Sequence, residues 1–211
     1  MALNSTIESV AAGLVVLSLW MIGISQFQTS VRLFSAQSAA VGLLAVYIGG
    51  MKHEAMLIGV GLAVVLFKGI VVPWCVSYSA RRVGCRRESS LAVAPPLQIF
   101  LAGTAVAFLS LSHPFHGELP ATAIPCLDIL LIGMILMVTR RLAVSQIIGF
   151  LVIENGIFLF TVSQPHSMPI LVETGVLMDV LAGTMLAGLL VFRISTTFEH
   201  VDVSKLKELR G

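Results

Sequence analysis

The sequence contains long apolar runs that restrict the chain to one class of fold. They span residues 6–28, 33–51, 55–78, 96–112, 120–139, 142–163 and 171–193. Each run is close to the roughly 20 residues that a helix needs to cross the hydrocarbon core of a bilayer. Barrel strands would alternate polar and apolar residues, which these runs do not do. The runs therefore predict an all-α, polytopic membrane helix bundle with about seven transmembrane helices.

The composition agrees with that class and excludes a large soluble domain. Of the 211 residues, 57% are hydrophobic and 11% are charged, whereas a soluble domain has about 25% charged residues. The longest polar stretches, around Ser79–Val93 and Thr196–Gly211, are too short to build a core. The three cysteines lack metal-site spacing, and the sequence has no nucleotide-binding or zinc-hydrolase motif. We therefore expect contact with membrane lipid, no metal or cofactor bound by this chain, and no nucleic-acid partner.

Basic residues gather after the odd-numbered runs and predict an orientation. After runs one, three, five and seven they are Arg32, then Arg81, Arg82, Arg86 and Arg87, then Arg140 and Arg141, then Arg193, Lys205, Lys207 and Arg210. Among the loops after the even-numbered runs, Lys52 is the only Lys or Arg. Loops rich in Lys and Arg stay in the cytoplasm. The pattern therefore predicts that the N-terminus is outside and the C-terminus is cytoplasmic.

Ionisable residues interrupt four of the apolar runs. They are Lys68, Asp128, Glu154 and Asp179. Each costs at least roughly 2.5–3.5 kcal/mol at mid-membrane depth, so it must face protein or water. Each lies 12 to 14 residues from an arginine at a cytoplasmic run end, or roughly 18–21 Å along a helix. We therefore predict that all four share one layer, with Glu173 nearer the external face, and that Pro73 kinks the third helix.

A layer of titratable groups within the membrane plane favours a lateral relay over a direct pore. A Lys–Glu pair in surroundings of low dielectric can exchange a proton at modest cost. Polar companions in or beside the runs are Gln37, Ser38, Ser145, Gln146, Asn155 and Thr184. They would support either a hydrated path or ordinary interhelical hydrogen bonding. The alternative for the charged residues is that they pair only to hold the helices together.

Several segments resemble one known family. Residues 140–160 read RRLAVSQIIGFLVIENGIFLF, residues 171–183 read LVETGVLMDVLAG, and residues 202–211 read DVSKLKELRG. With FKGIVVPWCVSYSARR at residues 67–82, they resemble the hydrogenase-4 component E family. That family belongs to membrane-bound group 4 nickel–iron (NiFe) hydrogenases and formate hydrogenlyase-type complexes. The last third is also similar to the K-type subunit of complex I and the C subunit of Mrp antiporters, with Glu154 and Asp179 near their two acidic positions.

The resemblance implies a function and an organisation of the chain. Residues 1–139 would form a five-helix membrane region, and residues 140–211 would form K-subunit-like helices with a short cytoplasmic tail. The protein would be a non-redox, multi-pass subunit in the cell (inner) membrane of a bacterium or archaeon, with no catalytic residues of its own. It would contribute to lateral proton or sodium translocation coupled to electron transfer in soluble subunits.

The same resemblance implies partners and candidate residues. The partners would be antiporter-like membrane subunits, a complex I H-type membrane subunit and a soluble hydrogenase-like module, which would hold the nickel–iron centre and the iron–sulfur clusters. The proton path would use Glu154, Asp179 and Lys68, joined by Glu173 and, on geometry alone, Asp128. The alternatives are a scaffold that bridges antiporter-like subunits and an Mrp-type cation/proton antiporter subunit. A self-contained transporter would be expected to show an inverted repeat, and the sequence shows none.

Overall fold

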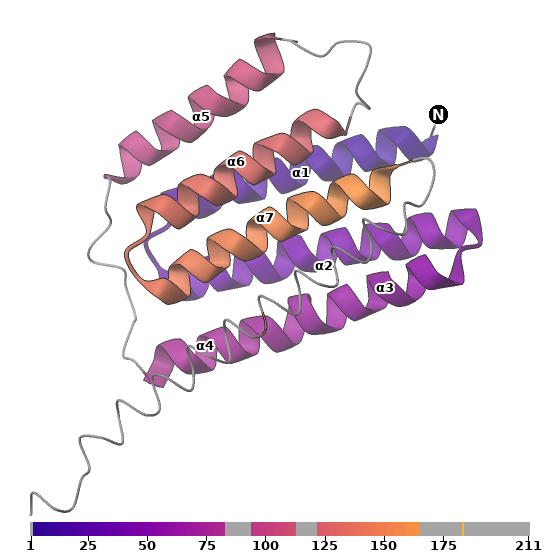
Figure 1. Ribbon diagram of the computed structural model, residues 1–211, viewed down its shortest axis with the longest axis horizontal. Coiled ribbons are helices and arrows are strands. Elements are labelled where there is room, and N and C mark those ends of the chain that lie inside the picture. Colours follow the sequence, from indigo (N-terminus) through magenta and orange to yellow (C-terminus); the bar gives the residue numbers. More distant parts are fainter. Residues whose placement is uncertain (1, 83–93, 113–121, 165–182, 184–211) are drawn as a thin grey trace, which may run out of the picture.

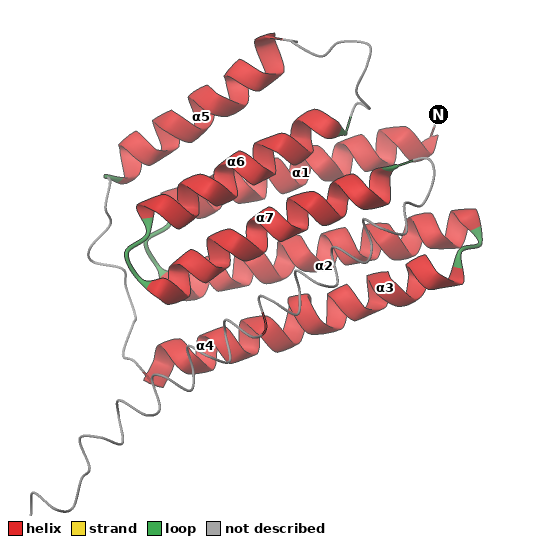
Figure 2. Ribbon diagram, in the orientation of Figure 1, coloured by secondary structure: helices red, strands yellow, loops and turns green. Residues whose placement is uncertain are grey.

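A computed structural model describes residues 2–82, 94–112, 122–164 and 183 of the chain, and this part contains helices and short connections only (Figure 2). The elements are α1 (Ala2–Gly23), α2 (Phe27–Lys52), α3 (Ala55–Leu66), the π-helical turn η1 (Phe67–Val71), α4 (Val72–Arg82), α5 (Pro95–Ser112), α6 (Ala123–Thr139) and α7 (Ala143–Ser163). The elements α3, η1 and α4 follow one another without a break. The all-helical prediction is therefore confirmed for the described residues.

Four helices form the centre of the bundle. The helices α1, α2, α6 and α7 pack against one another, with α6 beside α7 and α1 beside α2 (Figure 1). The helix α5 packs against α1 and α6 on one flank, and the α3–η1–α4 segment packs along α2 on the other. The hydrophobic core runs through these contacts and includes Leu14, Phe34, Ile129 and Leu159, each 1% exposed or less.

The two ends of the bundle are each marked by a basic residue. The Arg140 guanidinium donates hydrogen bonds to carbonyl oxygens at the end of α1, and the Lys52 ammonium donates one to the carbonyl oxygen of Gln164 after α7. The helices α1 and α6 therefore end together, at what we call the Arg140 end. The helices α2 and α7 end together at the opposite, Lys52 end. Successive helices thus alternate in direction, as a multi-pass chain requires.

Two helical hairpins are held by direct glycine contacts between their helices. In the α2–α3 hairpin, a Cβ atom on Gly61 would lie 2.8 Å from the carbonyl oxygen of Gly42. In the α6–α7 hairpin, a Cβ atom on Gly149 would lie 2.9 Å from that of Gly133. Small residues let membrane helices approach this closely. The hairpin turns lie at opposite ends of the bundle, as the predicted positions of the loops after the second and fifth runs imply.

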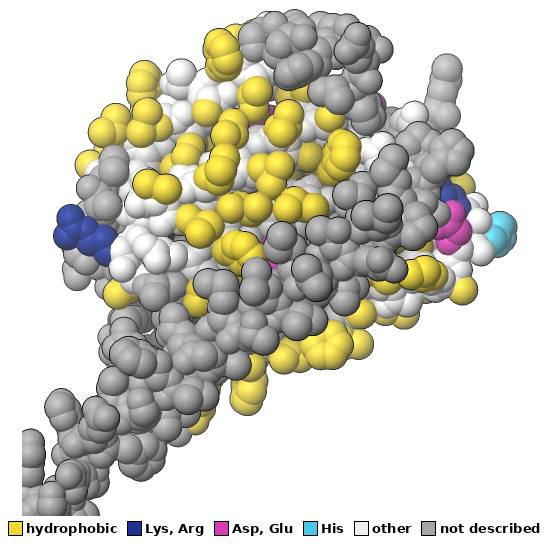
Figure 3. Space-filling view, in the orientation of Figure 1, with side chains coloured by type: hydrophobic (Ala, Val, Ile, Leu, Met, Phe, Trp, Pro, Cys, Tyr) yellow, Lys and Arg dark blue, Asp and Glu magenta, His cyan; other side chains and the backbone are white. Residues whose placement is uncertain are grey.

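The lengths and surfaces of the helices support a membrane protein. Four helical segments are long and apolar enough to cross a membrane: Leu3–Gly23, Phe27–Lys52, Ala55–Tyr78 and Ser145–Ser163. The apolar helices α5 and α6 are shorter. Large apolar side chains such as Trp20, Trp74 and Phe108 are 60% exposed or more, and Lys and Arg side chains lie at the two ends of the face in Figure 3. The seventh predicted run, residues 171–193, lies outside the described residues apart from Gly183.

The first predicted helix boundary was wrong. The sequence patterns placed helices at residues 6–28 and 33–51 with Arg32 in the intervening loop, whereas α1 ends at Gly23 and α2 begins at Phe27. The polar residues that suggested a loop form the first turns of α2 instead. The backbone N–H of Ser30 donates to the carbonyl oxygen of Gln26, 3.2 Å away. Polar side chains near a helix end can reach water while their backbone groups stay paired within the helix.

A substitution at His53 tests the end of α2. The residue adopts φ 57°, and Glu54 N–H donates to the carbonyl oxygen of Gly49 over 2.9 Å, which is a helix ending that favours glycine. We expect His53→Gly to raise the free energy of unfolding by about 0.5–1 kcal/mol, because the left-handed conformation strains a side chain. Thermal unfolding of the purified protein in detergent measures the change. Met51→Gly, within the helix, should lower stability by about the same amount, and a loss in His53→Gly would contradict the prediction.

Candidate functional site

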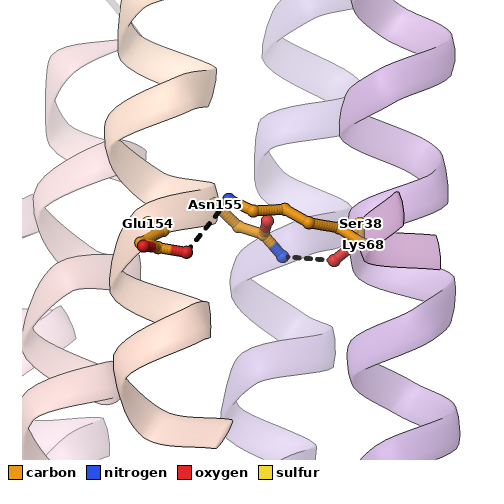
Figure 4. Close-up of polar contacts among 4 residues, drawn as sticks. All are labelled: Ser38, Lys68, Glu154 and Asn155. Carbon is orange, nitrogen blue, oxygen red and sulfur yellow. Dashed lines mark hydrogen bonds and ion pairs between the residues drawn. The ribbon is translucent and has the colours of Figure 1, made fainter. Parts of the chain in front are cut away.

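An ion pair lies in the interior between η1 and α7. The Lys68 Nζ atom is 3.1 Å from Oε2 of Glu154, and the side chains are 7% and 3% exposed (Figure 4). Lysine reaches across from the α2–α3 side of the bundle, and glutamate comes from the α6–α7 hairpin. The two residues were predicted to lie at one depth, and their contact agrees with that. A buried pair of opposite charges is costly to desolvate, so its two members depend on each other.

Hydrogen bonds extend the polar contacts to two more helices. The Asn155 amide on α7 donates to Ser38 Oγ on α2 over 2.9 Å (Figure 4). The Gln37 amide, next to Ser38, donates to Ser18 Oγ on α1 over 2.8 Å. All four side chains are 1% exposed or less. With Lys68 and Glu154 they form what we call the polar layer, which runs from η1 through α7 and α2 to α1.

The π-helical turn explains how Lys68 fits in the layer. Pro73 has no N–H, so it cannot bond to the carbonyl group four residues earlier, which belongs to Gly69. Ser35 Oγ on α2 donates to that carbonyl oxygen instead. The N–H of Val72 bonds to the carbonyl oxygen of Phe67, five residues back. The structure thus has one π-turn just before Pro73, where the sequence predicted a kink, and such turns often mark functional sites.

Asp128 is a third buried ionisable residue. It lies on α6 and is 3% exposed, and its Oδ1 atom has no hydrogen-bond donor among the described residues. Neither that carboxyl group nor the polar layer belongs to a metal cluster, since the described part of the chain brings no three His, Cys, Asp or Glu side chains together. Two other predicted path residues, Asp179 and Glu173, lie outside the described residues, as does Thr184. Their roles stay predictions.

Comparison with known proteins places the chain in a family. It is 30% identical over 213 residues to the uncharacterized protein Rv0085 of Mycobacterium tuberculosis, covering 97% of this chain and 96% of that protein. It is 28% identical over 216 residues to hydrogenase-4 component E of Escherichia coli K12 and of Shigella flexneri, covering 99% of each chain. The chain belongs to the same family as Rv0085, and it is similar over nearly its whole length to hydrogenase-4 component E. No model of a protein family matches it, and no solved structure matches it.

The similarity to hydrogenase-4 component E supports the main resemblance found in the sequence, which is to a family of hydrogenase membrane subunits. The alignments cover nearly the whole chain, so the similarity is not confined to the segment after residue 140. The further similarity of residues 140–211 to complex I and Mrp subunits stays a prediction, and so does the division of the chain after residue 139.

Two polar residues near the start of α7 make contacts that the sequence did not show. Arg140 lies in the loop between α6 and α7, as predicted, but its side chain is 5% exposed, and its Nη2 atom donates to the carbonyl oxygens of Met21 (3.1 Å) and Ile24 (2.8 Å). A cation at a helix C-terminus satisfies carbonyl groups that the helix leaves unpaired. Gln146 was expected to support a hydrated path or an interhelical hydrogen bond, and its amide donates to the carbonyl oxygen of Arg140 over 2.9 Å. Both residues hold the Arg140 end together.

Sequence reasoning also missed Ser18 and Ser35, which bind Gln37 and the Gly69 carbonyl group. Ser18 is a polar residue in the middle of the first apolar run, and that position is a signal that could have identified it. Nothing comparable identifies Ser35. Its importance depends on the π-turn in the neighbouring segment, which no residue pattern in α2 encodes.

Proposed function

We propose that this chain is a non-redox membrane subunit of a hydrogenase complex, and that it helps to move protons or sodium ions within the membrane plane. Two relatives that align over 99% of the chain are named hydrogenase-4 component E, and the name supports membership in such a complex. The observation that carries the transport role is the buried Lys68–Glu154 pair beside a π-turn. Ionisable residues at such depth are rare unless they serve a path for charge.

The pair suits proton transfer because it has two protonation states with the same total charge. In one, lysine is protonated and glutamate is ionised; in the other, the proton has moved to the carboxyl group and both are neutral. An incoming proton on Glu154 would release the Lys68 ammonium, which could then pass its own proton onward. Asp179 would continue the path from Glu154, with Glu173 as an external mouth and Asp128 as a further site.

The setting that we propose follows from the same features. The Arg140 end would face the cytoplasm, since basic residues favour that side, and the N-terminus would lie outside the cell (inner) membrane of a bacterium or archaeon. Antiporter-like and complex I H-type membrane subunits would be the neighbours. A soluble hydrogenase-like module would hold the nickel–iron centre and the iron–sulfur clusters.

A scaffold is the second candidate function, and the position of the ion pair favours it too. The pair connects the α2–α3 side of the bundle to the α6–α7 hairpin. A pair with that position can serve packing alone and bridge larger subunits without moving ions.

Glu154→Gln in the intact complex separates the two functions. Glutamine keeps the size of glutamate but cannot carry the proton, so we expect electron transfer per assembled complex to stay normal while ion translocation per assembled complex falls about a hundredfold, as for loss of a proton-transfer group. Native gels, electron-transfer rates and pH- or sodium-sensitive dyes in inverted membrane vesicles measure these quantities. Glu8→Gln, on the exposed surface of α1, is the control. Unchanged translocation per assembled complex would overturn the relay and favour the scaffold.

A further inference from the structure

The helix α2 contacts both halves of the ion pair through residues next to the charged ones. Ser35 Oγ donates to the carbonyl oxygen of Gly69, the residue after Lys68. Ser38 Oγ accepts from the amide of Asn155, the residue after Glu154. One helix therefore holds the immediate neighbours of both charged side chains.

The spacing of Ser35 and Ser38 places both serines on the same face of α2. They are three residues apart, so they lie on one face of α2, about 4.5 Å apart along its axis. Because α2 is rigid over that turn, the two hydrogen bonds fix where the η1 backbone and α7 stand relative to each other. From these contacts we propose that Ser35 and Ser38 are positioning residues that set the Lys68–Glu154 contact.

The π-turn is the part that needs such positioning. A return to α-helical hydrogen bonding would change the register by one residue and rotate the segment by about 100°. Lys68 is now 6% exposed, whereas its neighbour Phe67 is 63% exposed, so a rotation of that size would take lysine away from Glu154. The Ser35 hydroxyl donates to the Gly69 carbonyl oxygen, which lacks its usual helical donor because Pro73 has no N–H. This bond stabilises the π-turn.

Both flanks of the π-turn are fixed independently, which leaves the turn itself as the adjustable element. On the α3 side, Gly61 contacts the backbone of Gly42. On the α4 side, Ser77 Oγ donates to Gln28 Oε1 over 3.4 Å. A change in the turn would therefore redirect Lys68 while one of the two flanks keeps its contact with α2. Its meaning for transport rests on the proposed function, but the geometry can be tested alone.

Carbodiimide cross-linking tests the positioning directly. A membrane-permeant carbodiimide joins an amine and a carboxyl group in contact to form an amide, and the carbodiimide takes up the water as a urea. We expect a Lys68–Glu154 cross-link in membranes that contain the full complex, detected by mass spectrometry. Ser35→Ala and Ser38→Ala should each lower its yield about fivefold, the effect of losing one net hydrogen bond on an equilibrium.

Two control variants define the outcome. Ser35→Thr keeps the hydroxyl group and should restore the yield. Ser30→Ala removes a buried serine of α2 whose hydroxyl bonds to the carbonyl group of Gln26 in the same chain turn, so it should leave the yield unchanged. Wild-type yields in both Ser35→Ala and Ser38→Ala would overturn the proposal, as would a wild-type protein without the cross-link.

The cross-link separates this inference from the proposed function. If Glu154→Gln leaves translocation intact while the serine variants still lower the cross-link, the positioning stands and the relay fails. If the serine variants do not assemble, thermal unfolding of the purified chain against Ser30→Ala decides the matter. If the serine variants are as stable as Ser30→Ala, poor packing does not explain the loss of assembly, and the positioning role is supported. If they are much less stable than Ser30→Ala, the positioning role is overturned.

Discussion

Lys68→Met should destabilise the protein more than any substitution of an exposed residue. Methionine matches the length of lysine but leaves the Glu154 carboxyl group without the cation 3.1 Å away, at a site that is 3% exposed. Breaking a buried pair by removing one partner costs about 3–5 kcal/mol, because an uncompensated charge stays in the interior. Unfolding of the purified chain in detergent, followed by circular dichroism, measures the loss.

The double variant Lys68→Met with Glu154→Gln gives the decisive comparison. It removes both charges and keeps both shapes, so we expect it to recover most of the stability that Lys68→Met loses. Lys52→Met is the control, since that lysine lies at the end of the bundle, where its ammonium donates to the carbonyl oxygen of Gln164, and its loss should cost about 1 kcal/mol. A loss in Lys68→Met no larger than in Lys52→Met would contradict the prediction, and so would a double variant as unstable as the single one.

The double variant also distinguishes the two candidate functions. A scaffold needs only a well-packed interior, so a stable double variant should assemble and leave translocation intact. A relay needs groups that carry protons, so the same variant should assemble without moving ions. Because the double variant recovers its stability, the presence or absence of translocation does not depend on how much folded subunit is present.

Much of the fold could be predicted from the sequence because lipid imposes a simple rule on long apolar runs. The runs predicted helices wherever the structure describes them, and the depth count placed Lys68 and Glu154 at one level. The boundary near Arg32 failed because polarity alone does not end a helix. The opposite ends at which the two glycine hairpins turn follow from the predicted loops, whereas the pairing of Gly61 with Gly42 shows only in the packed structure.

The candidate site was predictable in its charges but not in its surroundings. An ionisable residue in an apolar run is conspicuous, whereas a serine such as Ser35 is ordinary until its partner is known. Its partner is a carbonyl group freed by Pro73 in another helix, and that depends on how the helices are rotated. Arg140 shows the same limit: a basic residue near a run end indicates a cytoplasmic loop, and only the packed helices show that it caps α1.

The α2–α3 hairpin gives the other large expected effect. We expect Gly61→Ala to lower the free energy of unfolding by about 3 kcal/mol, at the upper end of the range for overpacking. The added Cβ atom would lie 2.8 Å from the Gly42 carbonyl oxygen and 2.9 Å from the backbone nitrogen of Val46. Backbone atoms of a helix cannot move aside as a flexible side chain can, so the two helices must separate. Denaturant or thermal unfolding in detergent measures the change.

Gly59→Ala is a control two residues away in the same helix. A Cβ atom there meets nothing within 4 Å, so alanine should raise stability by about 0.5–1 kcal/mol through its higher helix propensity. Separation of α2 and α3 in Gly61→Ala would also carry Lys68 away from Glu154, since η1 continues α3 without a break. We therefore expect the Lys68–Glu154 cross-link to fall in Gly61→Ala and to persist in Gly59→Ala. Equal stability of the two variants would show that the hairpin tolerates a wider spacing. It would then contradict the claim that close packing of α2 and α3 holds Lys68 against Glu154.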